Sequence, residues 1–119
     1  MKCFAQAIDL VDDPTLIAEY RAHHQRVWPE VVSELQEIGI IEMRIYLLGT
    51  RLFMYAQARD EFDPTRDYQR YAEHPRCREW DALMRRYQRP APGHDPAHGW
   101  WTAMEEVFDL AKCRHHSTG

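Results

Sequence analysis

The feature that most constrains the fold is a pair of strand-like segments joined by a two-residue turn. In Ile41–Leu48 an apolar residue stands at every second position, and Leu52–Ala58 follows shortly after Gly49 and Thr50. Alternation with a period of two places the apolar side chains on one face of a strand. A short connection that contains glycine is typical of antiparallel neighbours. The sequence therefore predicts an antiparallel hairpin that is covered on one face.

Prolines divide the rest of the chain into short elements. Proline is favoured at the first position of a helix, and an aspartate before it can cap the exposed N–H groups. On this basis we expect helices that begin at Pro14, Pro29, Pro64 and Pro75. We expect two further strands, over Phe4–Leu10 and Trp101–Leu110.

This order of elements predicts an α+β fold of the ferredoxin-like type, in which helices cover one face of an antiparallel sheet. The 119 residues are enough for one domain, so we expect a single domain over 1–119, with 111–119 as a frayed tail. The uncovered face of the sheet would need a partner. We therefore expect a homodimer that packs sheet against sheet as a dimeric α/β barrel.

Composition excludes several classes of partner. The net charge of −4 argues against binding to nucleic acid, which favours a basic surface. No apolar run approaches the roughly 18 residues that a membrane span needs. The three cysteines, Cys3, Cys77 and Cys113, are far apart, and the first residues do not resemble a secretory signal. We expect a cytoplasmic protein with free thiols.

A histidine near the end of the first helix is the leading candidate for chemistry. Tyr20 and His24 are four residues apart and share a helix face, and Pro29 interrupts the helix soon afterwards. Histidine transfers protons near neutral pH because its ordinary pKa is about 6.5. Spacing alone equally allows a histidine that is hydrogen-bonded within the core. The adjacent His23 points about 100° away and is expected to be exposed.

A second candidate is Trp80, which recurs with Met84 and Tyr87 at helical spacing. A tryptophan beside polar groups can stack on the C–H face of a sugar. The same spacing also fits the core stripe of an amphipathic helix, and the pattern leaves both interpretations open.

Metal and nucleophile chemistry have little support. Proline interrupts the spacing between His94 and His98, and His115 and His116 belong to the tail. Cys3 and Cys77 fit small buried apolar residues. The chain has no phosphate-binding glycine loop and no dinucleotide fingerprint. We therefore expect no metal and no cofactor.

One segment resembles a known family. The run from Tyr20 to Glu30, Tyr-Arg-Ala-His-His-Gln-Arg-Val-Trp-Pro-Glu, is similar to the Tyr…His…Trp-Pro-Glu segment of the L-rhamnose mutarotase family. Later landmarks of the family follow in the same order, so that the resemblance extends from about Lys2 to Leu110. These landmarks are Ile45-Tyr46-Leu47, Leu52-Phe53, Cys77-Arg-Glu-Trp80 and Glu105-Glu-Val-Phe108.

The resemblance implies a dimeric ferredoxin-like enzyme that needs no metal or cofactor and interconverts the α and β anomers of a deoxy-L-sugar. By this resemblance His24 matches the proton donor, and Tyr20 and Trp80 match residues that contact the sugar. We also assign Tyr46 to the sugar contacts. The second proton-transfer group stays open, with Asp81 and Glu42 as candidates.

Two residues depart from the family pattern. Met43 stands where the rhamnose enzymes have a sugar-contacting tyrosine, and Asp81 stands in place of a second tryptophan. A site that is built around one pattern of hydroxyls rejects another, because its polar groups are then left unpaired. The prediction is therefore a pocket for L-rhamnose or L-fucose, lined by Met43 and Asp81, with L-fucose as the first candidate.

Two other functions use the same type of fold. A small monooxygenase-type enzyme of the ferredoxin-like barrel group would turn over an aromatic or quinone substrate. A non-catalytic dimer would bind a small ligand without changing it. The ordered match of motifs favours the mutarotase over both.

Overall fold

The computed structural model describes residues 1–94 and 100–111. Four helices and five strands make up these residues, and the longer elements begin close to the predicted positions. In chain order they are β1 Lys2–Leu10, α1 Pro14–His24, α2 Pro29–Glu37, β2 Ile40–Leu48, β3 Arg51–Ala58, α3 Pro64–Glu73, α4 Pro75–Arg85, β4 Gln88–Arg89 and β5 Thr102–Ala103.

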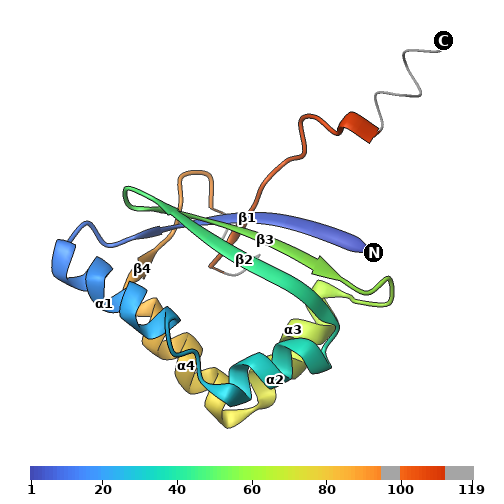
Figure 1. Cartoon of the computed structure of the whole chain (residues 1–119), viewed down its shortest axis with the longest axis horizontal. Helices are drawn as coiled ribbons and strands as arrows, with labels where there is room; N and C mark the ends of the chain where they lie inside the picture. The colour runs from blue at the N-terminus through green and yellow to red at the C-terminus, as the bar shows by residue number, and fades with distance from the viewer. Residues whose placement is uncertain (95–99, 112–119) are drawn as a thin grey trace.

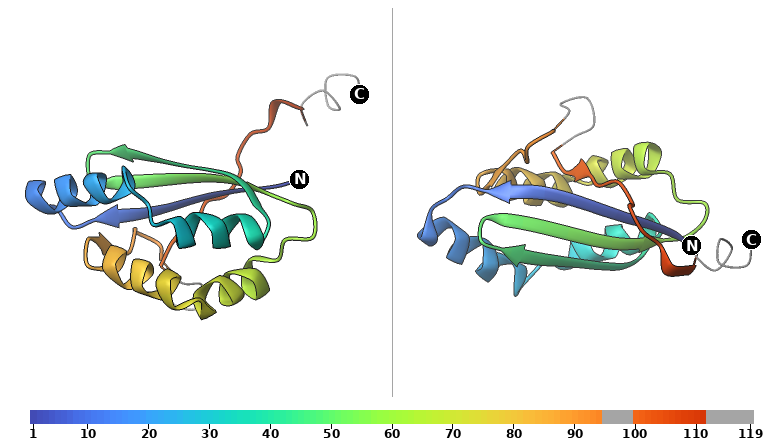
Figure 2. Two further views of the ribbon diagram at one scale, coloured as in Figure 1. Left: turned by 60° about the horizontal axis from the view of Figure 1, so that its bottom comes forward. Right: turned by 90° about the horizontal axis from the view of Figure 1, so that it is seen from above.

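The strands form one antiparallel sheet in the order β2-β3-β1-β4, and β5 also pairs with β1. All four helices lie on one face of this sheet (Figures 1 and 2). The predicted α+β, ferredoxin-like architecture is thus confirmed, as an open sheet that is not closed on itself. Among the described residues, no helix is long and apolar enough to cross a membrane.

Side-chain caps fix where α1 and α3 begin. The Asp13 carboxylate accepts the N–H groups of Thr15 and Leu16 at 2.8 and 3.2 Å, so that α1 starts at Pro14. Asp63 caps α3 in the same way. Because these bonds satisfy N–H groups that have no partner within the helix, local sequence alone places the helix starts correctly.

The core lies between the sheet and the helices. Alternate residues of β3 point into it, and Leu52, Ala56 and Ala58 are almost fully buried. Helix residues such as Tyr20 and Trp80 pack against them in the same cluster. Among residues 1–94 and 100–111, no layer covers the side chains on the other face of β2 and β3.

The predicted alternation in β2 is wrong at its start. Ile40 is 6% exposed, whereas Ile41 is 55% exposed. The register shifts between Ile40 and Glu42, so that Ile41 is an extra residue opposite β3. A β-bulge of this kind turns a side chain to the other face.

The last predicted strand, Trp101–Leu110, is also largely wrong, because only Thr102 and Ala103 pair with β1. Beyond them an extended arm, residues 104–111, leaves the body of the protein (Figure 1). Its apolar side chains are exposed, with Val107 at 91% and Phe108 at 68%. The predicted tail falls mostly on 112–119, outside the described residues. The short strand β4 has no clear pattern in the sequence.

Candidate active site

His24 is the last residue of α1, and its imidazole is held by the helix itself. Its Nδ1 atom lies 3.0 Å from the carbonyl oxygen of Tyr20, one turn earlier. A carbonyl oxygen only accepts hydrogen bonds, so Nδ1 carries the hydrogen that is donated. In the neutral ring, Nε2 is then left with a free lone pair. The side chain is half-buried.

Burial sets the charge state of this ring. Desolvation lowers the pKa of His24, the hydrogen bond to the Tyr20 carbonyl raises it, and repulsion from His23 lowers it further. The net pKa lies below the ordinary value for histidine. His24 is therefore neutral near pH 7, with Nε2 available to take a proton.

Tyr20 supports the imidazole from the buried side. Its ring centroid lies 4.3 Å from that of His24, and the residue is only 3% exposed. Burial raises the pKa of Tyr20 to about 12, partly offset by a hydrogen bond with the Gln88 side chain. The phenol thus keeps its proton at neutral pH. The predicted pairing of Tyr20 with His24 on one helix face is confirmed.

Trp80, on α4, lies next to the same histidine. Its ring meets that of His24 edge to face, with 5.5 Å between centroids. It packs in the same manner against Trp28, at 5.2 Å. Trp80 is 6% exposed, so it forms a fixed wall of the cluster rather than a mobile surface ring. The interpretation as a core residue and the interpretation as a sugar platform are both compatible with this position.

His23 is not exposed as expected. It is half-buried, and its Nε2 atom lies 3.2 Å from the Tyr87 hydroxyl. Both residues line an open groove of about 600 Å³, to which Arg26 and Arg86 also contribute. The groove is lined by His23 and not by His24, so the two neighbouring histidines have different surroundings.

Met43 and Asp81 lie on the two layers that enclose the core. Met43 faces the helices from β2 and packs against the core cluster. Asp81 is half-buried on α4, and the Tyr71 hydroxyl donates to its Oδ1 at 3.3 Å. Desolvation raises the pKa of Asp81, while the bond from Tyr71 and the charge of Arg85 lower it. No spacing in the sequence singles out Tyr71, because this contact joins two helices.

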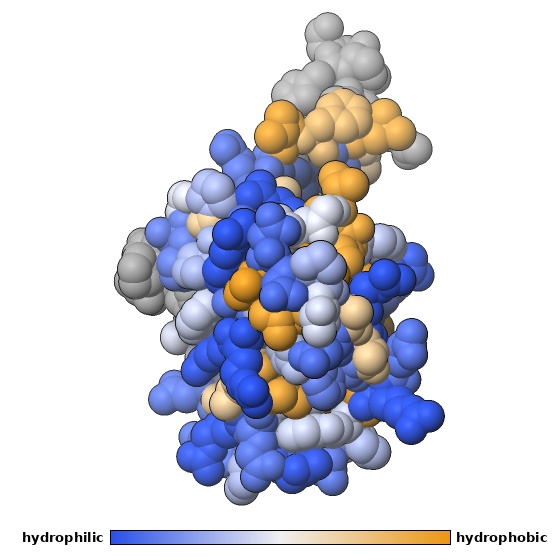
Figure 3. Space-filling model, turned by 90° about the vertical axis from the view of Figure 1, so that its left-hand side faces the viewer, coloured by the Kyte–Doolittle hydropathy of each residue, from blue (hydrophilic) through white to orange (hydrophobic). Residues whose placement is uncertain are grey.

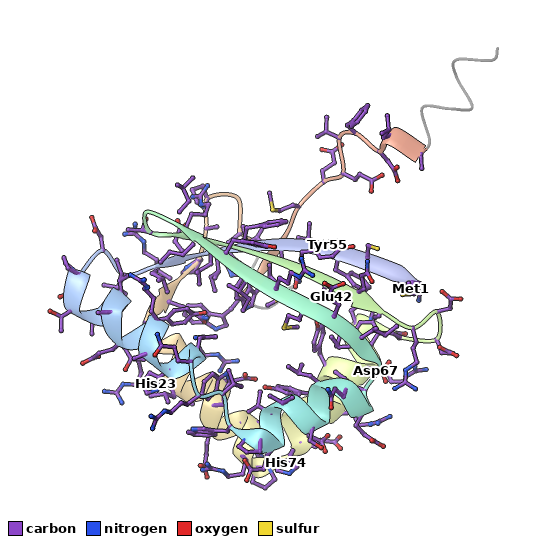
Figure 4. The ribbon with its side chains drawn as sticks, viewed as in Figure 1. Met1, His23, Glu42, Tyr55, Asp67 and His74 are labelled. Carbon is purple, nitrogen blue, oxygen red and sulfur yellow. The ribbon has the colours of Figure 1, made fainter. Side chains whose placement is uncertain are left out.

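Tyr46 and Glu42 are placed differently from the prediction. Both are residues of β2 that pair with β3, and their side chains lie on the face of the sheet that points away from the helices. Tyr46 is 52% exposed and stacks on Phe53, and Glu42 pairs with Arg44 at 2.6 Å. Figure 4 shows Glu42 on the sheet, far from His23 at the end of α1. Within one chain, Tyr46 is therefore not brought to His24, and Glu42 is not a base for it.

The other histidines and cysteines that the structure describes are not gathered into a site. Within residues 1–94 and 100–111, no three His, Cys, Asp or Glu side chains are grouped as metal ligands. His94 Nδ1 lies 3.5 Å from the Thr102 hydroxyl, whereas His98, His115, His116 and Cys113 are outside the described residues. Cys77 is buried as expected, but Cys3 is exposed, so the prediction for Cys3 is wrong.

Comparison with solved structures defines the fold class of the protein. A solved L-rhamnose mutarotase from Formosa agariphila superposes with a TM-score of 0.68 at 18% identity, over 92% of this chain and 99% of that one. Tetracenomycin F2 cyclase from Streptomyces glaucescens superposes with a TM-score of 0.59 at 15% identity, with the same coverage. At these identities the likeness shows the α+β fold alone.

Sequence comparison then gives the family. The family model for L-rhamnose mutarotase matches residues 3–110. An L-fucose mutarotase of Xanthomonas campestris is 41% identical, over 94% of this chain and 90% of the relative. An L-rhamnose mutarotase of Mannheimia succiniciproducens is 31% identical, over 82% and 89%. A Dictyostelium discoideum protein of the UPF0734 group is 48% identical, over 92% and 90%. The chain belongs to the L-rhamnose mutarotase family and is a sugar mutarotase, a carbohydrate isomerase.

Proposed function

We propose that the protein interconverts the α and β anomers of a deoxy-L-sugar, with His24 as the group that moves the proton. One observation carries this proposal: Nδ1 of His24 donates to the Tyr20 carbonyl, so that Nε2 is the unprotonated nitrogen of a neutral imidazole whose ring packs against Trp80. A neutral imidazole in a fixed tautomer is suited to general acid–base catalysis. The family and the names of the relatives support the reaction class.

Anomer exchange opens a hemiacetal and closes it on the other face. Nε2 of His24 takes the proton of the anomeric hydroxyl, the bond between the anomeric carbon and the ring oxygen breaks, and the ring oxygen receives a proton. Both oxygens are bonded to the same carbon, so one imidazole can take the proton from the first and return it to the second. After the aldehyde rotates, the same steps run in reverse and leave the other anomer.

The rest of the pocket has to hold the sugar while C1 turns. We assign stacking on the C–H face to Trp80, apolar contact to Met43, and the acceptance of hydroxyl hydrogens to Asp81. Tyr20 stays a predicted contact, since its phenol keeps a hydrogen that it can donate. Tyr46 lies on the opposite face of the sheet within one chain, so this proposal does not use it.

L-fucose is the first candidate among the sugars. Met43 and Asp81 replace two aromatic side chains of the rhamnose pattern, which changes the hydroxyls that can be hydrogen-bonded. The relative named L-fucose mutarotase is 41% identical, against 31% for a relative named L-rhamnose mutarotase.

NMR saturation transfer between anomers tests the function. The rate of exchange would be measured for L-fucose, L-rhamnose and D-glucose, with native protein and with heat-denatured protein as the control. We expect the native protein to accelerate exchange of a deoxy-L-sugar, and L-fucose the most. Absence of acceleration for every sugar would refute the proposal, and oxygen-dependent turnover of a quinone would favour the monooxygenase alternative.

We also propose that the protein works as a homodimer in the cytoplasm. The face of the sheet without helices carries exposed side chains, among them Leu48 at 85% and Tyr46 at 52%. The exposed apolar side chains of the arm add to this surface, and they form the apolar upper end of Figure 3. Burial of such surface against a second copy is favourable. Cys3 and Cys77 are free thiols, which suits a reducing compartment.

A further inference from the structure

A tyrosine outside the family landmarks holds one carboxylate of the proposed pocket. Tyr71, on α3, is 7% exposed, and its hydroxyl donates to Oδ1 of Asp81 on α4 at 3.3 Å. Burial, the nearby charge of Asp81 and the Cys77 side chain keep the pKa of the phenol far above its usual value. Tyr71 therefore acts only as a neutral hydrogen-bond donor.

Asp81 forms no ion pair with any residue that the structure describes. None of the ion pairs between described residues includes Asp81, and Arg85, one turn further along α4, acts on it only through its charge. Cys77, one turn earlier, is a buried thiol whose pKa is raised by desolvation. A half-buried carboxylate that accepts one hydrogen bond from a neutral donor among the described residues retains lone pairs for further donors.

Asp81 lies at the edge of the proposed pocket, so its lone pairs are near the sugar site. Asp81 follows Trp80 directly, and it lies three and four residues from Met84 and Cys77, which face the core. It thus borders the buried face of α4, on which Trp80 meets His24. The bond from Tyr71 occupies one site on Oδ1, so that the other oxygen can accept from a ligand.

We propose that Tyr71 is a positioning residue which fixes the Asp81 carboxylate for hydrogen bonds from neighbouring hydroxyls of the sugar, and that this pair determines which hydroxyl pattern is accepted. The inference rests on the proposed function and deepens it. A carboxylate only accepts hydrogen bonds, so it selects sugars that present hydroxyl donors at that point. Without Tyr71 the carboxylate loses a fixed orientation and a partner.

Three variants test this, with L-fucose exchange measured across substrate concentration and pH. Tyr71→Phe removes only the hydroxyl and should raise KM about 3- to 10-fold, with kcat within twofold of the native value. Asp81→Asn removes the charge and should raise KM about 10- to 100-fold. Tyr68→Phe is the matched control on the same helix, since the Tyr68 ring packs against Phe62, and it should leave KM unchanged.

The pH profile separates positioning from mere packing. The hydrogen bond from Tyr71 lowers the pKa of Asp81. When this bond is lost in Tyr71→Phe, the rise of KM in acid, where Asp81 is protonated, should begin at a higher pH, and it should not shift in Tyr68→Phe. An unchanged KM and acid limb in Tyr71→Phe would overturn the inference. So would a fall in kcat at constant KM, because that result would place the pair in proton transfer.

Binding of L-fucose, measured by ligand-observed NMR, distinguishes the proposed anomer exchange from the proposed role of Tyr71. If the native protein binds the sugar without accelerating exchange, the proposed function fails. Weaker binding in Tyr71→Phe, with native binding in Tyr68→Phe, would still support the inference. Equal binding in both variants would overturn it.

Discussion

The Nδ1 atom of His24 lies 3.0 Å from the carbonyl oxygen of Tyr20, so the backbone of α1 selects the tautomer of the histidine side chain. This bond costs the helix little, because a carbonyl oxygen has two lone pairs and can accept the imidazole N–H beside a bond within the helix. It leaves Nε2 as the unprotonated nitrogen of the neutral ring, which is the atom that the proposed reaction uses. The proposed reaction therefore starts with His24 as a base and ends with it as an acid.

Replacement of His24 tests this role directly. His24→Gln keeps a side chain of similar size without a titratable nitrogen, and we expect anomer exchange to fall about 10²- to 10⁴-fold. NMR saturation transfer would measure the rate, and circular dichroism would check the fold. His23→Gln is the matched control and should keep most of the activity. Near-native exchange in His24→Gln would contradict the assignment.

The pH dependence follows from the burial of His24. Protonation occupies the lone pair on Nε2, so activity is lost as the pH falls through the pKa that His24 has in the folded protein. Because the pKa of His24 lies below the ordinary value of about 6.5, the midpoint of the fall in kcat/KM should lie below pH 6.5. A titration of the His24 ring protons by NMR should give the same midpoint. An acid limb above pH 6.5 would be inconsistent with a neutral, desolvated ring.

Trp80 is expected to serve stability and binding together. It is 6% exposed, so Trp80→Ala should lower the free energy of unfolding by about 3–5 kcal/mol through the cavity that it leaves. Trp80→Phe fills most of this volume and should retain the fold, yet raise KM for the sugar. Urea denaturation and saturation transfer would measure the two effects. A native KM in Trp80→Phe would remove Trp80 from the sugar contacts.

The oligomeric state can be tested on the uncovered face of the sheet. Light scattering should give about twice the 14.2 kDa mass of the chain. Tyr46→Glu, which places a charge on that face, should shift the protein towards the monomer. Val32→Glu is the control, because Val32 is an exposed apolar residue on α2 at 43%. A native protein that is monomeric at micromolar concentration would refute the dimer.

The pair of Asp9 and Arg51 should control stability in acid. Arg51 Nε donates to Asp9 at 2.8 Å, and this bond holds the pKa of Asp9 below its usual value. Asp9 therefore stabilises the fold above pH 4, and this contribution is lost as pH falls through its lowered pKa. Arg51→Met should lower the urea midpoint at pH 7 and less so at pH 3. Arg44→Met, which breaks the exposed pair with Glu42, should change it little at either pH.

Local sequence determined most of the longer elements of this protein and one contact of its candidate site. The starts of the helices follow from Pro14 and Pro64 with their capping aspartates, since caps act within three residues. The hairpin follows from a period of two around a glycine turn. The pairing of Tyr20 and His24 follows from a spacing of four. Each of these depends only on residues that are near one another in the chain.

Only the tertiary structure decided which of the candidate residues meet. The extra residue at Ile41 shifts the register of β2 against β3, and no local pattern of β2 marks that shift. The pairing of the strands leaves Tyr46 on the far side from Trp80, although the sequence had grouped them. The bond from Tyr71 to Asp81 joins two helices, and its strength depends on their packing. Residue spacing specifies neighbours on one element, whereas contacts between elements arise when the sheet and helices bury a common core.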